Sequence, residues 1–158
     1  MRTLQTARIT FEDHLPYNSK GIKWIAHDSI CEELGTLLCN KHRPLGKIKL
    51  EFPEVDYMYL LPYDEDDAVW NNHVIKTSDE DDIARRETTE DMSHRAYKVL
   101  VNFLHPRPER EIAVVGHSAW LLAMTGAVLD IGEEEEEDMT SMFGQAEMRS
   151  MELIFLEQ

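Results

Sequence analysis

His117 and Ser118 stand at a turn whose surroundings could bind an anion. Residues 112–115 (IAVV) form a continuous apolar run, which is typical of a strand buried on both faces. Gly116 interrupts this run, and the apolar residues 119–129 predict a buried helix. This order places His117 at the carboxyl end of a strand and over a helix amino terminus, where N–H groups and the helix dipole favour negative charge. By itself, His117 is as consistent with a structural role as with a catalytic one.

Two other charged positions could join this turn, although neither is distinctive alone. Arg2 opens a predicted helix over residues 2–11, where apolar side chains recur at helical spacing. From this stretch alone, a solvated surface arginine is the favoured interpretation. Glu32 and Glu33 fall in a predicted loop, where a solvated acidic pair is the simplest interpretation.

Two short motifs change this balance. Residues 2–7 (RTLQTA) resemble the end of the motif S-P-L-x-R-(A/T)-x-Q-T-A, and residues 114–121 (VVGHSAWL) resemble V-V-(S/T)-H-(G/S). Both belong to the histidine phosphatase superfamily, also called the phosphoglycerate mutase-like family. Each motif is moderately specific, and the two in this order and separation are fairly specific. The resemblance extends from Arg2 to about Ile154 and implies a three-layer α/β/α fold of the phosphoglycerate mutase type.

The resemblance assigns roles to the candidate residues. Arg2, His117 and Ser118 would bind the phosphoryl oxygens of a small phosphorylated substrate. Residues 27–35 (HDSICEELG) resemble L-x-E-x-x-G, which makes Glu32 the candidate acid. Beside bound phosphate its pKa would rise, so that it could protonate a leaving oxygen. The usual Arg before this acid is Cys31 here. No metal or organic cofactor is implied, because the nucleophile of the superfamily is a side chain.

Residues 39–57 (CNKHRPLGKIKLEFPEVDY) resemble a subgroup common in plants, algae and fungi, with C-D-K-R-R-x-I followed by F-P-x-(V/I)-D-(F/Y). Asn40 replaces the usual Asp, and His42 replaces an Arg. The segment holds a basic cluster, and two interpretations are about equally favoured: the cluster lines the substrate side, or it is a surface loop that serves solubility. Its members are Lys41, His42, Arg43, Lys47 and Lys49.

The nucleophile of the superfamily is absent from these residues. In the family, the His of an amino-terminal R-H-G motif attacks phosphorus and carries it as a phosphohistidine. No R-H-G occurs in the 158 residues, and none of the remaining histidines follows an apolar strand into a turn; they are His14, His27, His42, His73, His94 and His105. The resemblance therefore predicts a truncated domain whose first strands lie upstream. The competing interpretation is a true short protein with a rearranged sheet.

Three hypotheses about function follow. The first is a parent enzyme that hydrolyses a small phosphate ester, with this chain inactive alone; phosphatase activity is favoured over mutase activity. The second is a non-catalytic module that binds an anion or a basic protein partner. The third is an α/β domain whose motif matches are coincidental. It is the least favoured because the motifs occur in the expected order and separation.

Length and composition bound the remaining expectations. A chain of 158 residues predicts one α/β domain, here with an acidic insertion around residues 56–86. The net charge of −15 argues against nucleic acid as a partner, and a phosphate site would have to be a local positive pocket. No apolar stretch is long enough for a membrane span, and no signal peptide is evident. Two sparse cysteines, Cys31 and Cys39, match no zinc pattern and favour a reducing, cytoplasmic compartment.

The remaining elements follow from local patterns. Residues 22–25 predict a short strand, and residues 148–156 predict the last strand. Residues 88–91 (TTED) are a helix-start signal. The helix that follows has an inward stripe of Met92, Ala96, Val99, Leu100, Phe103 and Leu104 and ends at Pro106. The acidic runs 64–67, 79–82 and 132–138 are expected to be solvated, with Trp70 anchoring the insertion to the core.

Overall fold

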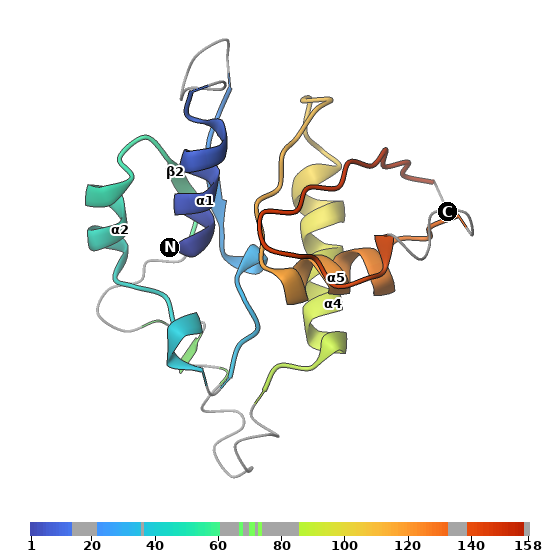
Figure 1. Cartoon of the computed structure of the whole chain (residues 1–158), viewed down its shortest axis with the longest axis horizontal. Coiled ribbons are helices and arrows are strands. Elements are labelled where there is room, and N and C mark those ends of the chain that lie inside the picture. The colour runs from blue at the N-terminus through green and yellow to red at the C-terminus, as the bar shows by residue number, and fades with distance from the viewer. Residues whose placement is uncertain are drawn as a thin grey trace.

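The computed structural model describes residues 1–13, 22–35, 37–60, 67, 70–71, 73, 86–132 and 139–156. Its helices are α1 (Arg2–Phe11), α2 (Leu45–Glu51), α4 (Thr89–Val99) and α5 (Ser118–Ala127). Its strands are β1 (Ile25–His27) and β2 (Asp56–Tyr59). Short 3-10 turns span Asp28–Ile30 and Leu38–Asn40, and a π-helical turn at Leu100–Leu104 prolongs α4. Figure 1 shows α1, α2 and the two strands on one side, and α4 and α5 on the other.

The two strands form a small parallel sheet, so the described residues combine helices and a parallel sheet as an α/β chain does. Ile25 pairs with Asp56 and His27 with Tyr59, with an irregularity between the two pairs. The predicted strand at 22–25 is therefore shifted toward the carboxyl end. The shift arises because pairing begins where the Asp56 N–H donates to the Trp24 carbonyl, at 2.8 Å.

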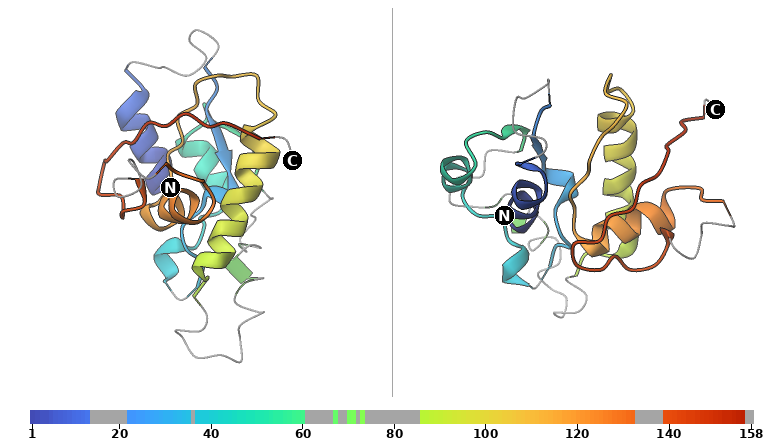
Figure 2. Two further views of the ribbon diagram at one scale, coloured as in Figure 1. Left: turned by 90° about the vertical axis from the view of Figure 1, so that its right-hand side faces the viewer. Right: turned by 45° about the horizontal axis from the view of Figure 1, so that its top comes forward.

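Two predicted strands are wrong within the described residues. Residues 112–115 and 148–156 run without sheet pairing, and Ile112 is 44% exposed although burial on both faces was expected. In Figure 2 both segments lie beside the α4 and α5 helices as unpaired chain. An apolar run becomes a strand only where a second strand satisfies its backbone N–H and C=O groups. The described sheet contains only β1 and β2, which pair with each other.

The predicted inward stripe of α4 is confirmed. Met92, Ala96, Val99 and Leu100 are buried, and Phe103 and Leu104 pack partly buried beside them. This face meets Trp120 and Met124 of α5 to form the main core cluster. The helical region ends before Pro106, as expected from the missing N–H of proline.

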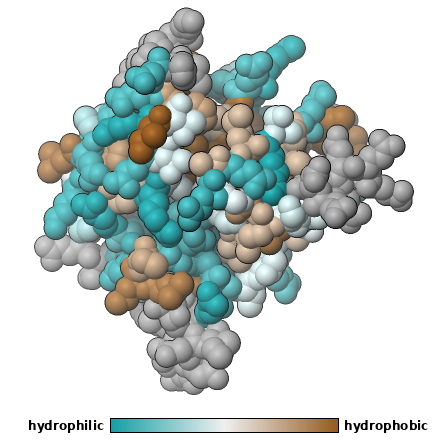
Figure 3. All heavy atoms as spheres, viewed as in Figure 1, coloured by the Kyte–Doolittle hydropathy of each residue, from teal (hydrophilic) through white to brown (hydrophobic). Residues whose placement is uncertain are grey.

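Two smaller clusters hold the rest of the chain. The first joins α2 and β2 through Ile48, Phe52, Val55 and Tyr57, and Met1 and Leu4 pack against it from α1. The second comprises Cys31, Leu34 and Trp70, which confirms that Trp70 packs into the core. Large apolar side chains are also exposed, and Figure 3 shows brown surface scattered among teal on the face viewed.

The acidic run 64–67 ends in a residue that is not solvated. Asp67 is buried and bonded to His42, which corrects the expectation of a solvated run at this position. The acidic residues 79–82 and 133–138 lie outside the described residues. None of the helices in the described ranges has the length and hydropathy needed to span a bilayer.

Helix α4 begins with the capping box that the sequence predicts. The Thr88 hydroxyl oxygen accepts the Asp91 N–H at 3.1 Å, and the Asp91 carboxylate accepts the Thr88 N–H at 3.3 Å. Replacing Thr88 with alanine is expected to lower the free energy of unfolding by about 1 kcal/mol, measured in urea. The control is Ser93→Ala, which removes a hydroxyl bonded to the Thr89 carbonyl within the helix and is expected to change stability by less than about 0.5 kcal/mol. Equal losses in both variants would contradict the capping argument.

Candidate functional site

Arg2, Glu32 and His117, which are far apart in the sequence, converge on one point. The His117 ring Nδ1 lies 3.2 Å from Glu32 Oε2, and the Arg2 guanidinium Nη2 lies 3.6 Å from the same oxygen. Arg2 comes from the first turn of α1, Glu32 from the coil after the Asp28–Ile30 turn, and His117 from the residue before α5. The structure thus brings together the three charged residues that the sequence singled out.

The protein environment keeps Glu32 in its ionised form. Burial by itself would raise the pKa of Glu32. The hydrogen bond and charge of His117, the Glu33 N–H and the charge of Arg2 outweigh burial and hold that pKa below its ordinary value. The protein groups around Glu32 therefore do not raise its pKa. The raised pKa that the resemblance implies would require a bound phosphate.

The predicted helix after His117 forms, as α5, whereas neither a strand nor a turn is assigned to residues 111–117. His117 is the N-cap residue of α5, in an extended conformation, and its carbonyl accepts the Leu121 N–H at 2.8 Å. A Cβ atom at Gly116 would lie 3.2 Å from the Leu121 side chain and 3.4 Å from the Trp120 ring. Glycine therefore lets the chain pass close to the first turn of the helix, and this sets the position of the imidazole.

Ser118 is turned toward a different segment. Its hydroxyl donates to the Phe143 carbonyl at 2.7 Å, so the hydroxyl proton is already used. A phosphate oxygen at this helix start would meet Ser118 through its backbone N–H, which has no partner within the helix. The binding role of Ser118 stays a prediction.

A cavity of about 830 Å³ opens beside the three converging residues. Arg2, Glu32 and His117 line it, together with β1 and residues 111–115. Residues 41–43 of the basic cluster also line it, whereas Lys49 extends over the Tyr57 ring, 5.8 Å from its centroid. Residues 41–43 of the basic cluster thus lie beside the cavity, and their role toward a substrate stays a prediction.

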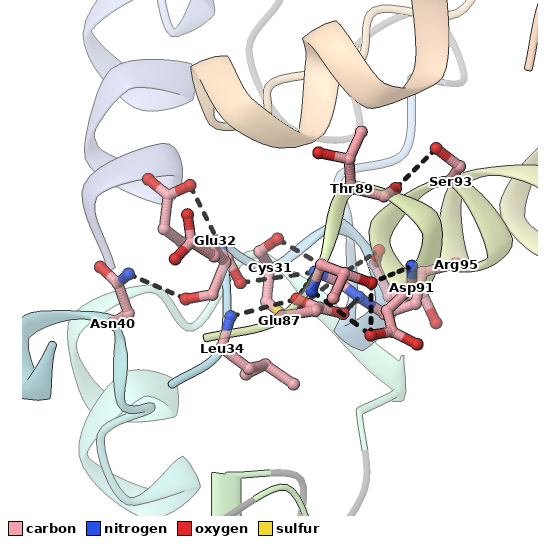
Figure 4. Close-up of polar contacts among 12 residues, drawn as sticks. Cys31, Glu32, Leu34, Asn40, Glu87, Thr89, Asp91, Ser93 and Arg95 are labelled. Atoms are coloured by element: carbon pink, nitrogen blue, oxygen red, sulfur yellow. Dashed lines mark hydrogen bonds and ion pairs between the residues drawn. The ribbon is translucent and has the colours of Figure 1, made fainter. Parts of the chain in front are cut away.

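Three residues that the sequence analysis did not select hold this arrangement together. Asn40 accepts from Arg2 Nη2 at 3.0 Å and donates to the Glu33 carbonyl at 2.9 Å, so it links α1 to the Glu32 segment. Arg95 and Glu87 contact the same segment from the other side (Figure 4). A signal for Arg95 was present, because it lies between Met92 and Ala96, next to the buried stripe of α4.

The site has no candidate metal centre among the residues that the structure describes. No group of three or more His, Cys, Asp or Glu side chains in those ranges is placed to share an ion. The groups that converge are instead a guanidinium and an imidazole around one oxygen, an arrangement that suits an anion.

Comparison with known proteins finds one informative relative. The chain is 30% identical over 131 residues to phosphoglycerate mutase-like protein 1 from Arabidopsis thaliana. The match covers 82% of this chain and 42% of that protein, so the chain spans less than half of the length of its relative. No protein-family model and no solved structure matches the chain. The relative carries the name of the family that the two sequence motifs resemble.

Proposed function

We propose that this chain carries the phosphate-binding part of a histidine phosphatase site, whose parent enzyme hydrolyses a small phosphate ester through a phosphohistidine. One observation carries the proposal: Arg2 and His117 both reach the same carboxylate oxygen of Glu32, at 3.6 and 3.2 Å. The two groups are thus already arranged around one anionic oxygen. A phosphoryl oxygen carries similar charge and accepts the same charge-assisted hydrogen bonds.

In this proposal Arg2 and His117 stabilise the phosphoryl group by charge during its transfer. Glu32, protonated once phosphate lies beside it, gives its proton to the leaving oxygen. The substrate enters from the cavity, where residues 41–43 add positive charge within a molecule of net charge −15. The partner is accordingly a small phosphorylated molecule. Neither Cys31 nor Cys39 forms a disulfide, which supports the further proposal of a reducing, cytoplasmic location.

The nucleophile in this proposal comes from an R-H-G segment that these 158 residues do not contain. The cavity between β1 and residues 111–115 supports this idea, because it lies between the small sheet and the extended chain that leads to His117. Strands placed there would pair with both and complete a three-layer α/β/α fold. The 158 residues by themselves are therefore proposed to be inactive.

Measurements of phosphate binding test whether Arg2 and His117 form an anion site. Orthophosphate affinity, measured by calorimetry, is expected to fall about 10- to 100-fold in Arg2→Met and in His117→Gln, because each loses a charge-assisted hydrogen bond of about 1.5–3 kcal/mol. The matched control is Arg8→Met on the same helix, whose guanidinium pairs with Glu54 instead. Arg8→Met is expected to change affinity less than twofold. Unchanged affinity in Arg2→Met and His117→Gln would refute the proposed site.

Turnover tests the proposed source of the nucleophile. The 158-residue chain is expected to show no metal-independent hydrolysis of p-nitrophenyl phosphate, whereas a longer protein with R-H-G ahead of Arg2 is expected to hydrolyse it. Activity in the short chain that His117→Ala abolishes would show that these residues contain their own nucleophile.

A non-catalytic anion-binding module is the second candidate. It is favoured by the ionised Glu32, which already contacts both Arg2 and His117 as a resting counter-ion would. A longer protein with R-H-G that binds orthophosphate through Arg2 and His117 but hydrolyses no phosphate monoester would support this candidate over the first.

A further inference from the structure

Glu32 lies in a segment that has no regular structure of its own. The Asp28–Ile30 turn ends just before it, and residues 31–34 form neither helix nor strand. The Glu32 carboxylate accepts only from the Glu33 N–H within the segment, at 3.2 Å. A loop of this kind takes a single position only where tertiary contacts hold its backbone.

The Arg95 side chain supplies such contacts. Its Nη1 donates to the Ser29 carbonyl at 2.9 Å and to the Cys31 carbonyl at 3.3 Å, and its Nη2 approaches the Glu32 carbonyl at 3.5 Å. Figure 4 shows the guanidinium reaching from α4 to this backbone. A planar guanidinium can serve several acceptors in one plane, which a lysine ammonium cannot do with the same geometry.

Glu87 fixes Arg95 in turn. Its two carboxylate oxygens accept from Arg95 Nε and Nη2, each at 2.6 Å, and the two side chains are only 4% and 16% exposed. Glu87 also bonds to Leu34, at the carboxyl end of the loop. Its carboxylate accepts the Leu34 N–H at 3.1 Å, and its own N–H donates to the Leu34 carbonyl at 2.8 Å. The loop is therefore held on both sides of Glu32 by one buried pair.

We propose that Arg95 and Glu87 are positioning residues, which hold the Glu32 segment so that the Glu32 carboxylate meets His117. The role of Glu32 toward substrate rests on the proposed function, whereas its placement rests on the contacts above. Breaking a buried ion pair destabilises a protein whatever its role. A loss of stability therefore does not test the proposal, and the readout has to be the contact between Glu32 and His117 itself.

The test is a titration of the Glu32 carboxyl by carbon-detected NMR in the chain without any ligand. His117→Gln is expected to raise the Glu32 pKa in the wild-type background, because it removes the hydrogen bond and charge that lower it. In Arg95→Lys, which keeps the positive charge, the Glu32 pKa is expected to be raised already, and adding His117→Gln is expected to leave it unchanged. The same rise on adding His117→Gln in both backgrounds would overturn the proposal.

Arg149→Lys is the matched control. Arg149 pairs with Glu147 at the same 2.6 Å, is also largely buried and also bonds backbone carbonyls, those of Met139 and Ser141. The Arg149→Lys variant is expected to be less stable than wild type. Adding His117→Gln to it is still expected to raise the Glu32 pKa by the full amount. Loss of that effect in Arg149→Lys as well would show a general loosening of the fold and would also overturn the proposal.

A second variant covers the case in which Arg95→Lys does not fold. Glu87→Gln keeps the size of the side chain but removes its charge and replaces one oxygen by a donor, so one of the two hydrogen bonds from Arg95 is lost. It is expected to weaken the effect of His117→Gln on Glu32, and an undiminished effect would contradict the proposal. These titrations use no phosphate, so failure of orthophosphate binding to depend on Arg2 and His117 would refute the proposed function and leave the positioning role standing.

Discussion

Asp67→Ala is expected to lower the free energy of unfolding by about 3–5 kcal/mol, because it breaks a buried ion pair and leaves one member without its partner. The Asp67 side chain is 1% exposed. One of its oxygens accepts both the N–H and the ring Nδ1 of His42 at 2.8 Å, and the other accepts the Trp70 N–H at 3.0 Å. These bonds join the segment before α2 to Trp70.

The same pair makes this loss depend on pH. Burial lowers the pKa of His42, but the hydrogen bonds and charges of Asp67 and Cys31 raise it overall from 6.5 to about 9. A folded-state pKa above the unfolded one contributes stability that is complete below about pH 6.5 and is lost as the pH rises to about 9. Asp67 acts at the acid end, because its pKa is lowered in the folded protein and its contribution is lost as the pH falls below its ordinary range.

Urea unfolding at several pH values tests this expectation. The difference between wild type and Asp67→Ala is expected to be largest between about pH 4 and 6.5 and to shrink toward pH 9. The control is Glu51→Gln, which removes an exposed partner of Arg43 and is expected to cost less than about 1 kcal/mol at every pH. A difference that stays constant from pH 5 to 9 would contradict the ion-pair argument.

Glu32→Gln is expected to change binding and turnover in opposite directions. An ionised Glu32 occupies the Arg2 guanidinium and the His117 imidazole and repels a second anion, so its neutral isostere should bind sulfate or orthophosphate about tenfold more tightly. In the longer protein with R-H-G, the same substitution removes the proposed acid and should lower turnover about 10²- to 10⁴-fold. A residue that serves only the fold would not produce this pair of effects.

Sulfate keeps its charge across the pH range, so the pH dependence of its binding does not include a titration of the ligand. It can therefore be used to follow the effect of the Glu32 carboxyl. The gain in sulfate affinity of Glu32→Gln over wild type is expected to be largest near pH 7.5 and to diminish in acid as the wild-type Glu32 protonates. Glu33→Gln is the matched control, because the neighbouring Glu33 pairs with Arg86 at 2.6 Å and does not contact His117. Equal gains in both variants would show a general charge effect and would contradict the specific contact.

Local patterns in the sequence were sufficient for the features that depend on neighbouring residues. The helix over residues 2–11, the capping box at Thr88 and the helix that follows His117 all form as predicted. Each is decided by hydrogen bonds and steric limits within a few residues. The same holds for the buried stripe of α4, whose spacing is a property of the helix itself. Trp70 was correctly assigned to the core because of its size and apolarity.

Only the tertiary structure decided the features that need a distant partner. Residues 112–115 and 148–156 have the composition of strands but run unpaired, because a strand depends on backbone groups supplied by another segment. Asp67 lies in an acidic run that was expected to be solvated, and Arg95 was not singled out. Each is largely buried because a partner of complementary charge, His42 or Glu87, meets it. The sequence named Arg2, Glu32 and His117 through motifs, but their meeting at one oxygen is set by long-range packing, which no local pattern encodes.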